Sequence, residues 1–500
     1  MPTRCTSGSE TCLTLTPRSI SSAGRGSNNY WNLRRPRPRP RITPPIRQND
    51  MSSRRFMLAG TTGGLFQEPR MRHVPSALMI ALALATACAD AALAPAPAPR
   101  PAGKAAPASS AATGAAETEW PCWLGPNRDG KSPDKGLLKE WPSGGPPLLW
   151  KAEGIGKGFS TVSVSGGLIY TSGDVDERFV VFAFDMDGKP KFKIDHDEAW
   201  TKNHPGSRST PTIDGGNLYV ESGHGTVGCY DARTATRKWT RKLSEFGGRP
   251  PNWGYAESVL ILGNLAIVVP GEKNCIVALN KLTGQPVWSS TGFSAGAQYG
   301  GCLPFTYQNV PLLACGTAAG LVCVDARSGA LVFLNDFSAK NTANCPTPAY
   351  ADGHLFWSNG YGKGGLCMKF ASAGGKVTAT EAYRTTDMVC HHGGYIIDNG
   401  CVYGNHEGGW ACLDLKTGQK KWNDRGVGKG SIFYADGMLY LFGESGGRAG
   451  LAVCSPDSFQ MKGTFSVQGS GPAWAHPVVI GGRLYLRYDN NLYCFDVRAK

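Results

Sequence analysis

Five charged or titratable side chains occupy corresponding points of a recurring pattern in this 500-residue sequence, and their types suit ligand binding. They are Arg208, Glu257, His392, Lys429 and His476. Arginine and lysine donate hydrogen bonds to anionic groups, and histidine changes its charge near neutral pH. If the fold brings the five together, they form a ring that can hold an anion or an acidic ligand.

Three further stretches carry residues suited to chemistry. Residues 195–198, followed by His204, contain metal-ligand types, and residues 391–392 and 405–407 are the next candidates. A solvated acidic loop explains the first stretch more simply than a metal does. The sequence shows no Ser/His/Asp nucleophile motif, phosphate-binding glycine loop or zinc-ligand spacing. These patterns therefore predict neither a catalytic residue nor a metal ligand.

The element that positions the five residues is a repeated eleven-residue stretch. In residues 278–288 a short apolar strand ends at Asn280, a Thr-Gly turn follows, and a second strand ends at Trp288. An Asp or Asn side chain can cap such a turn, and glycine adopts the positive φ that the turn needs. Further copies occupy residues 229–239, 323–333 and 412–422.

A larger unit surrounds each copy and contains four short strands. Its second strand follows a glycine and recurs eight times between residues 170 and 485, at intervals of 37 to 49 residues. Periods of about 40–50 residues with four strands each are typical of propeller blades. We therefore predict an all-β, eight-bladed propeller over residues 145–500, with four-stranded antiparallel blades.

The eighth blade lacks its last strand, because the chain stops at Lys500 where a strand ending in Trp is expected. The strand that ends at Trp150 supplies it, so we expect this N-terminal strand to complete the C-terminal blade and close the ring. The five charged residues then enter first strands of their blades and ring one mouth of the central channel. Propeller channels contain water and tolerate polar residues, so a structural role is the competing interpretation.

The A-x-D/N-x-x-T/S-G-x-x-x-W stretches resemble the tryptophan-docking motifs of the pyrroloquinoline-quinone-type eight-bladed propeller repeat. Quinoprotein alcohol dehydrogenases and the propeller lipoprotein of the outer-membrane β-barrel assembly machinery share this repeat. The resemblance covers roughly residues 145–500, and the hairpins at residues 371–374 and 456–458 depart from it. It implies that the closing aromatics pack between neighbouring blades. These are Trp150, Trp239, Trp288, Phe333 and Trp422.

The resemblance implies functions of two classes. Enzymes of the family hold pyrroloquinoline quinone with calcium, between a Trp and a disulfide of two adjacent cysteines, and this sequence has no adjacent cysteines. Under that alternative Trp253 and Trp474 are the stacking candidates and Glu257 is a calcium ligand. We expect instead a non-catalytic, monomeric scaffold that presents loops on one face to an envelope protein partner or a small ligand.

The formal net charge of +14 lies mostly outside the predicted propeller. Residues 1–72 hold thirteen Arg and no Lys against Glu10, Asp50 and Glu68, so they carry +10 and the rest of the chain carries +4. A nearly neutral folded region lacks a general attraction to phosphate backbones. We therefore expect no nucleic acid partner.

The residues before the propeller indicate export. Residues 1–70 lack apolar periodicity and are expected to be disordered, or an upstream extension before a true start at Met71. Residues 71–90 have the positive start, apolar core and small-residue cleavage site of a secretory signal peptide. An Ala/Pro-rich linker over residues 91–118 and a turn-rich lead-in over residues 119–144 follow.

The cysteines favour packing over redox chemistry. Four of them occupy the position of Ala278 in the repeat, which predicts small buried side chains: Cys229, Cys323, Cys412 and Cys494. Export would also permit a disulfide, and the sequence leaves three pairs open. They are Cys302 with Cys315, Cys315 with Cys323, and Cys401 with Cys412.

Cys88 directly follows the predicted cleavage site, so the exported protein is either periplasmic or anchored to a membrane by a lipid there.

Processing at the signal peptide can be measured directly. We expect the unprocessed precursor to begin at Met71 and the mature protein to begin after residue 87, because the small-residue site ends there. N-terminal sequencing and intact mass determine both ends, and a lipid mass on Cys88 distinguishes the anchored form from the periplasmic one. A precursor that begins before Met71 would contradict the assignment of residues 1–70 as an upstream extension.

Overall fold

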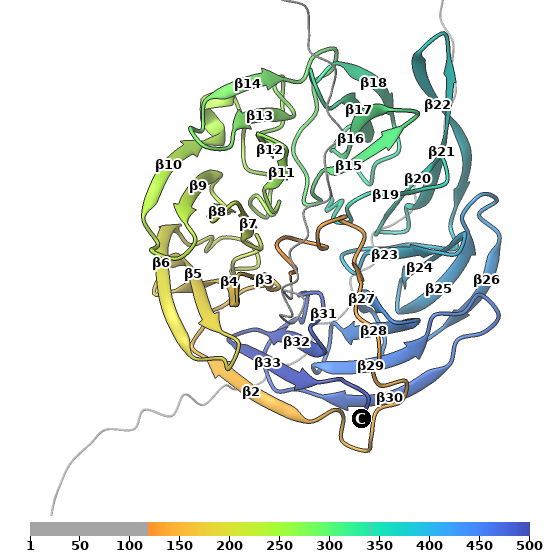
Figure 1. Ribbon diagram of the computed structural model, residues 1–500. Helices are drawn as coiled ribbons and strands as arrows, with labels where there is room; N and C mark the ends of the chain where they lie inside the picture. Colours follow the sequence, from red (N-terminus) through yellow and green to blue (C-terminus); the bar gives the residue numbers. More distant parts are fainter. Residues whose placement is uncertain (1–118, 341) are drawn as a thin grey trace, which may run out of the picture. The chain divides into compact units, whose positions relative to one another are not determined.

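The computed structural model describes residues 119–340 and 342–500. These residues form eight antiparallel blades arranged in a ring (Figure 1), with the short 3₁₀ helix η1 (Leu243–Phe246) between two of them. The predicted all-β, eight-bladed propeller is thereby confirmed. The signal peptide, the linker and Cys88 lie outside the described residues. In the part of the chain that the structure describes, no helix is long and apolar enough to cross a membrane.

The first four blades follow the chain in order. Blade 1 contains β3 (Ser163–Ser165), β4 (Leu168–Val175), β5 (Arg178–Asp185) and β6 (Pro190–Glu198); blade 2 contains β7 (Thr212–Asp214), β8 (Asn217–Glu221), β9 (Thr226–Asp231) and β10 (Arg237–Lys242). Blade 3 contains β11 (Leu260–Leu262), β12 (Leu265–Val268), β13 (Val277–Asn280) and β14 (Pro286–Ser289); blade 4 contains β15 (Leu303–Tyr307), β16 (Val310–Gly316), β17 (Leu321–Asp325) and β18 (Leu331–Asn335).

The remaining blades continue the ring. Blade 5 contains β19 (Ala349–Ala351), β20 (His354–Asn359), β21 (Gly364–Ala373) and β22 (Lys376–Thr385); blade 6 contains β23 (Tyr395–Asp398), β24 (Cys401–His406), β25 (Gly409–Asp414) and β26 (Lys420–Asp424). Blade 7 contains β27 (Gly430–Ala435), β28 (Met438–Gly443), β29 (Arg448–Val453) and β30 (Met461–Ser466); blade 8 contains β31 (Val478–Ile480), β32 (Arg483–Tyr488) and β33 (Asn491–Asp496).

The ring closes through a strand from the start of the described chain. Strand β2 (Leu148–Glu153) pairs antiparallel with β33, and Trp150 lies opposite Cys494. In Figure 1 this orange strand lies along the outer edge of the blue C-terminal blade. The strand that the sequence places around Trp150 therefore supplies the fourth strand of blade 8, and neither end of the repeat leaves an open sheet edge towards its neighbour.

The lead-in is part of the fold, which the sequence did not indicate. Strand β1 (Lys131–Ser132) pairs parallel with β27 and adds a fifth strand to blade 7. Farther along, the Leu138 N–H donates to the Val497 carbonyl, and the Trp141 N–H donates to the Lys462 carbonyl. The segment thus runs from the centre of the ring outward over blades 7 and 8, as the orange trace in Figure 1 shows.

Closing aromatics lie against glycines of the next blade. A Cβ atom at Gly284 would lie 2.8 Å from the Trp239 ring, and one at Gly188 would lie 2.5 Å from the Trp150 ring. The Trp239 indole N–H also donates to the Lys281 carbonyl at 2.9 Å. The turn glycine is therefore needed for two reasons: it adopts a positive φ, and it leaves room for the neighbouring indole.

Blade 5 uses a different closing aromatic from the ones named in the sequence. Its outer strand carries Tyr383, whose ring would lie 2.5 Å from a Cβ atom at Gly418, and whose hydroxyl donates to the Leu415 carbonyl at 2.9 Å. The hairpin β21–β22 is ten residues long on each side, so its turn at residues 374–375 is too distant to give the eleven-residue spacing. The spacing fails there although the same contact forms.

Strand register limits the cysteine pairs that the sequence left open. The register that pairs Leu303 with Ala314 places Cys302 opposite Cys315 when it is extended by one residue. Neither Cys315 and Cys323 nor Cys401 and Cys412 are directly opposite each other in their strand pairs. The cysteines among the described residues are free thiols. All four cysteines predicted to be buried are fully buried, which confirms their packing role.

Two glycine turns of blade 3 give a matched test of the contact between blades. Gly284 and Gly263 have φ values of 70° and 58°, so an alanine at either position costs about 1–2 kcal/mol. Gly284→Ala also presses a methyl group against Trp239, whereas Gly263→Ala meets open space. Overpacking adds about 1–3 kcal/mol. We expect denaturant unfolding to show the larger loss for Gly284→Ala, and equal losses would contradict a stabilising contact at this turn.

Candidate functional site

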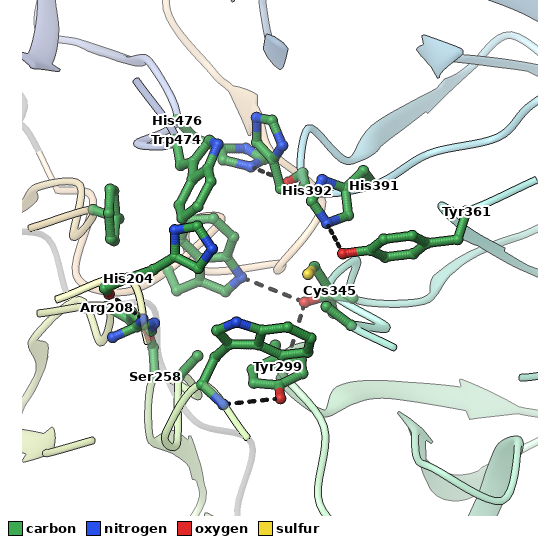
Figure 2. A pocket seen from close by; sticks show the side chains of 17 residues that line it. His204, Arg208, Ser258, Tyr299, Cys345, Tyr361, His391, His392, Trp474 and His476 are labelled. Carbon is green, nitrogen blue, oxygen red and sulfur yellow. Dashed lines mark hydrogen bonds between the residues drawn. The ribbon is translucent and has the colours of Figure 1, made fainter. Parts of the chain in front are cut away.

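The inner ends of the blades enclose a cavity of about 280 Å³ (Figure 2). Most of its wall comes from the last four residues before a blade's first strand, such as Phe159 before β3, Arg208 before β7 and His476 before β31. These first strands are the innermost strands of the ring. The repeat therefore determines which residues reach the cavity, because corresponding positions of successive blades face the same axis.

The lead-in contributes a wall residue as well. The Trp123 indole packs edge-on against His476, with ring centroids 4.7 Å apart, and its N–H donates to the Thr347 hydroxyl at 3.4 Å. Nearby, the buried Arg128 guanidinium donates to the carbonyls of Ser258 and Val259, each at 2.9 Å. Arg128 thus fastens the lead-in between the blades, and Trp123 is held beside the cavity.

The structure separates the five charged residues predicted to form one ring. Arg208, His392 and His476 line the cavity, whereas Glu257 and Lys429 do not. Glu257 is 3% exposed and accepts a hydrogen bond from the Cys302 N–H at 3.0 Å. Both side chains point to partners behind the wall, so the complete ring does not form. Ligand binding by the other three stays a prediction.

Lys429 acts on the cavity through another side chain. Its ammonium forms an ion pair with Glu444 at 3.0 Å, and the same carboxylate accepts a hydrogen bond from the Trp474 indole N–H at 2.6 Å. Trp474 lines the cavity and packs on Phe159, with ring centroids 4.6 Å apart. The ion pair therefore holds the Trp474 ring in place from behind.

Arg208 is the cavity's permanently charged side chain. Its guanidinium donates to the carbonyls of Gly206 at 2.7 Å and His204 at 2.6 Å, so its own loop holds it. Burial lowers the pKa of Arg208 to about 10, and the guanidinium stays protonated at neutral pH. The guanidinium also lies over the Phe159 ring, 5.7 Å from its centroid. This side chain gives the cavity a fixed positive charge.

Three imidazoles of the wall, on His391, His392 and His476, are uncharged at neutral pH. Burial lowers the pKa of His391 and of His476 to about 4, and it lowers the pKa of His392 well below its ordinary value. The positive charge of Lys429 lowers the pKa of His391 and His392 further. Both ring nitrogens of His392 are buried without a hydrogen-bond partner. These side chains offer neutral donors and acceptors rather than charge.

Several wall residues could not be found from the sequence. Trp123 and Tyr361 line the cavity, yet neither lies just before a blade's first strand. Figure 2 shows Tyr361 and His391 on one side of the cavity and Arg208, His204 and Trp474 on the other. Tyr361 shares a hydrogen bond with His391 at 3.1 Å. Loop conformation places these side chains, and no repeated spacing marks them.

The acidic stretch at residues 195–198 has structural partners. Asp195 forms an ion pair with Arg178 at 2.8 Å, and the two His196 ring nitrogens contact the Tyr230 hydroxyl and the Thr226 carbonyl. Across residues 119–340 and 342–500, no group of three His, Cys, Asp or Glu residues could hold a metal ion. Residues 195–198 therefore lie in strand β6 rather than in the solvated loop expected from the sequence, and their polar groups have protein partners.

The wall fits only part of what the quinone alternative requires. Trp253 and Trp474 both line the cavity, as a stacked ring would need. Calcium prefers six to eight oxygen ligands, including carboxylates. No Asp or Glu lines the described cavity, and Glu257 is turned away from it towards Cys302. The residues present therefore do not fit the calcium ion on which the alternative relies.

A pair of buried carboxyl groups lies behind the wall. Glu221 and Glu257 are 2% and 3% exposed, and neither oxygen of Glu221 has a hydrogen-bond partner. Burial raises the pKa of Glu221 well above its ordinary value, and repulsion from Glu257 raises it further. Burial likewise raises the pKa of Glu257, against the lowering effect of the Cys302 N–H and Arg128. The pair of carboxyl groups therefore retains a proton at neutral pH.

Removing one of these carboxyl groups should stabilise the protein at alkaline pH. Because the folded-state pKa values are raised, the pair's contribution to stability is present below about pH 4.5 and is lost as the pH rises through and beyond about 7. Glu221→Gln removes one titrating group. We compare the change in unfolding free energy that Glu221→Gln causes at pH 8 with the change it causes at pH 5. We expect the change at pH 8 to be more stabilising by at least about 1.4 kcal/mol.

The matched control for this measurement is Glu140→Gln, because Glu140 is exposed. Thermal unfolding at several pH values measures both variants against the unchanged protein. An effect of Glu221→Gln that is the same at pH 5 and pH 8 would contradict a raised pKa.

Comparison with known proteins assigns this chain to a family. The family model described as outer membrane protein assembly factor BamB matches residues 141–289 and 193–424, which together span more than half of the chain. No curated protein matches. Among solved structures, BamB from Moraxella catarrhalis is similar at 15% identity with a TM-score of 0.52, covering 71% of this chain and 98% of that one.

Two other solved structures share the fold. Quinohemoprotein alcohol dehydrogenase ADHIIG from Pseudomonas putida HK5 is 13% identical with a TM-score of 0.52, covering 76% of this chain and 80% of that one. The computationally designed Ika8 protein is 10% identical with a TM-score of 0.50, covering 70% of this chain and all of that one. These identities establish the fold alone. On the family match, the chain belongs to the propeller family of the outer membrane protein assembly factor BamB.

Proposed function

We propose that this protein is a non-catalytic binding propeller of the cell envelope, and that its binding site is the central cavity. The observation that carries the proposal is an aromatic-walled cavity that contains one fixed positive charge, on Arg208, and no carboxylate among its described lining residues. Concave, mostly apolar sites with a few polar groups are the usual form of small-ligand sites. The loops around the same mouth offer a surface to an envelope protein.

The location in the envelope is supported by two independent observations. Residues 71–90 have the pattern of a secretory signal peptide. The matched family is named for outer membrane protein assembly, and a solved BamB covers most of the propeller. From these two observations we infer that the protein is exported and is either periplasmic or tethered to a membrane by a lipid on Cys88. We also infer that it works beside an envelope protein partner.

A binding role suits the chemistry of the wall better than catalysis does. Histidines whose pKa is lowered to about 4 are weak general bases at neutral pH. Burial raises the pKa of the Cys345 thiol to about 12, so this side chain is a poor nucleophile. The wall's polar groups are therefore suited to hydrogen bonding and charge pairing with a ligand.

Filling the cavity should abolish ligand binding without unfolding the propeller. Ala256 lines the cavity, so Ala256→Phe places a ring inside it. The matched control is Ala371→Phe, on the exposed part of β21. Native mass spectrometry of protein purified from envelope extract measures the bound small molecule. We expect it on the unchanged protein and on Ala371→Phe, and its loss from Ala256→Phe.

Two outcomes would contradict the proposal. One is a small molecule that remains bound equally to Ala256→Phe, which would place the site elsewhere. The other is a bound quinone that oxidises an alcohol in the presence of calcium and an artificial electron acceptor, which would favour the dehydrogenase alternative.

A further inference from the structure

We infer that the cavity takes a small aromatic acid, whose carboxylate or sulfonate group pairs with Arg208 while its ring lies against Trp474 and Phe159. The inference rests on the proposed function, since it names the ligand class of the same site. Four features carry it: the charge balance around Arg208, the free donors of its guanidinium, the arrangement of the aromatic rings and the size of the cavity.

The surroundings of Arg208 carry an excess of positive charge. Two guanidinium groups, Arg208 and the buried Arg487, act on the carboxyl group of Asp174, and Asp489 acts on Arg487 alone. Neither oxygen of Asp174 has a hydrogen-bond partner, so it forms no direct pair with Arg208. Burial raises the pKa of Asp174 to about 7, which leaves it only partly ionised at neutral pH. An anion entering the cavity would therefore neutralise a charge that the protein leaves unbalanced.

The guanidinium is positioned but not saturated. It has five N–H donors, and three hydrogen bonds hold it, to the carbonyls of Asn203, His204 and Gly206. These carbonyls are neutral, so the bonds fix the side chain without cancelling its charge. The Nε–H and one Nη1–H remain to donate to a carboxylate or sulfonate, and the positive charge strengthens such a hydrogen bond.

Flat rings border the position of this charge. Trp474 packs on Phe159 with centroids 4.6 Å apart, and His204 and His392 lie 5.3 Å and 5.9 Å from Trp474. Figure 2 shows Trp474 between the Arg208 side of the cavity and His392. Aromatic surfaces favour a planar ligand because offset and edge-on contacts add to the hydrophobic gain.

The size of the cavity limits the ligand to one or two rings. At about 280 Å³ it lies just below the range of about 300–1,000 Å³ that is usual for drug-sized ligands. The uncharged imidazoles of His391, His392 and His476 add hydrogen-bonding groups but no second positive charge. The site therefore favours a single acid group on a compact ring over a large polyanion.

The test separates charge from ring with three probes on the mature protein. 2-Naphthoate has both features, 2-naphthalenemethanol has the ring without the charge, and cyclohexanecarboxylate has the charge without a flat ring. Isothermal titration calorimetry at neutral pH measures the affinities. We expect 2-naphthoate to bind at least tenfold more tightly than either other probe. Equal affinities for 2-naphthoate and 2-naphthalenemethanol would overturn the role of the anion.

Two variants assign the effects to residues. Arg208→Gln should weaken 2-naphthoate about tenfold or more and leave 2-naphthalenemethanol unchanged, whereas Trp474→Leu should weaken both. Arg327→Gln is the control, because Arg327 is an exposed arginine in a hairpin of blade 4. If Arg208→Gln does not fold, the comparison of probes on the unchanged protein still decides. Unchanged 2-naphthoate affinity in a folded Arg208→Gln variant would overturn the assignment.

Failure of this inference can be told apart from failure of the proposed function. If 2-naphthalenemethanol binds as well as 2-naphthoate and Ala256→Phe abolishes both, the cavity is a binding site and only the acid class is wrong. If no probe binds and native mass spectrometry finds no small molecule, both proposals fail.

Discussion

The contact between a closing aromatic and the turn glycine of the next blade is the interaction on which the rest of this structure depends. Four-stranded sheets are arranged around a common axis only if contacts fix each sheet to its neighbours. Trp239 on Gly284 and Tyr383 on Gly418 show how this is done: an indole or phenol occupies the space that a Cβ would fill, and its polar atom donates to a backbone carbonyl. Because the contact recurs, the first strands of the blades meet at the axis in the same orientation.

When the first strands meet at the axis, polar residues are also brought into a confined space. Most of these polar residues do not form ion pairs. Burial keeps His392 and His476 uncharged, and the pair formed by Glu221 and Glu257 retains a proton. Arg128 contributes a compensating charge from the lead-in, outside the repeat. Arg208 is the exception, because a guanidinium stays protonated wherever it is buried. The cavity's charge is consequently located at one side chain.

The repeat made the fold and part of the site predictable. Spacing identified eight blades, the closing strand at Trp150 and the positions of Arg208, His392 and His476 beside the axis, because these depend on local strand and turn chemistry. It could not place Glu257 or Lys429, since side-chain direction at a strand entrance depends on the partners Cys302 and Glu444. Nor could it show that Trp123 lines the cavity or that Tyr383 closes blade 5, because a long-range packing arrangement and a ten-residue hairpin leave no fixed spacing.

The same architecture is similar to an assembly factor, a quinohemoprotein dehydrogenase and a designed protein, so the ring itself does not select a function. Function on a shared fold depends on the residues of the site that the fold carries. Here those positions and the lead-in supply aromatic rings, neutral imidazoles and one guanidinium, while the Glu257 carboxyl group is turned away from the cavity towards Cys302. An ion that needs several carboxylates finds no ligands in such a wall, whereas an anion finds an unbalanced charge. The direction of a few side chains at the axis, rather than the blades that carry them, therefore determines what this propeller can bind.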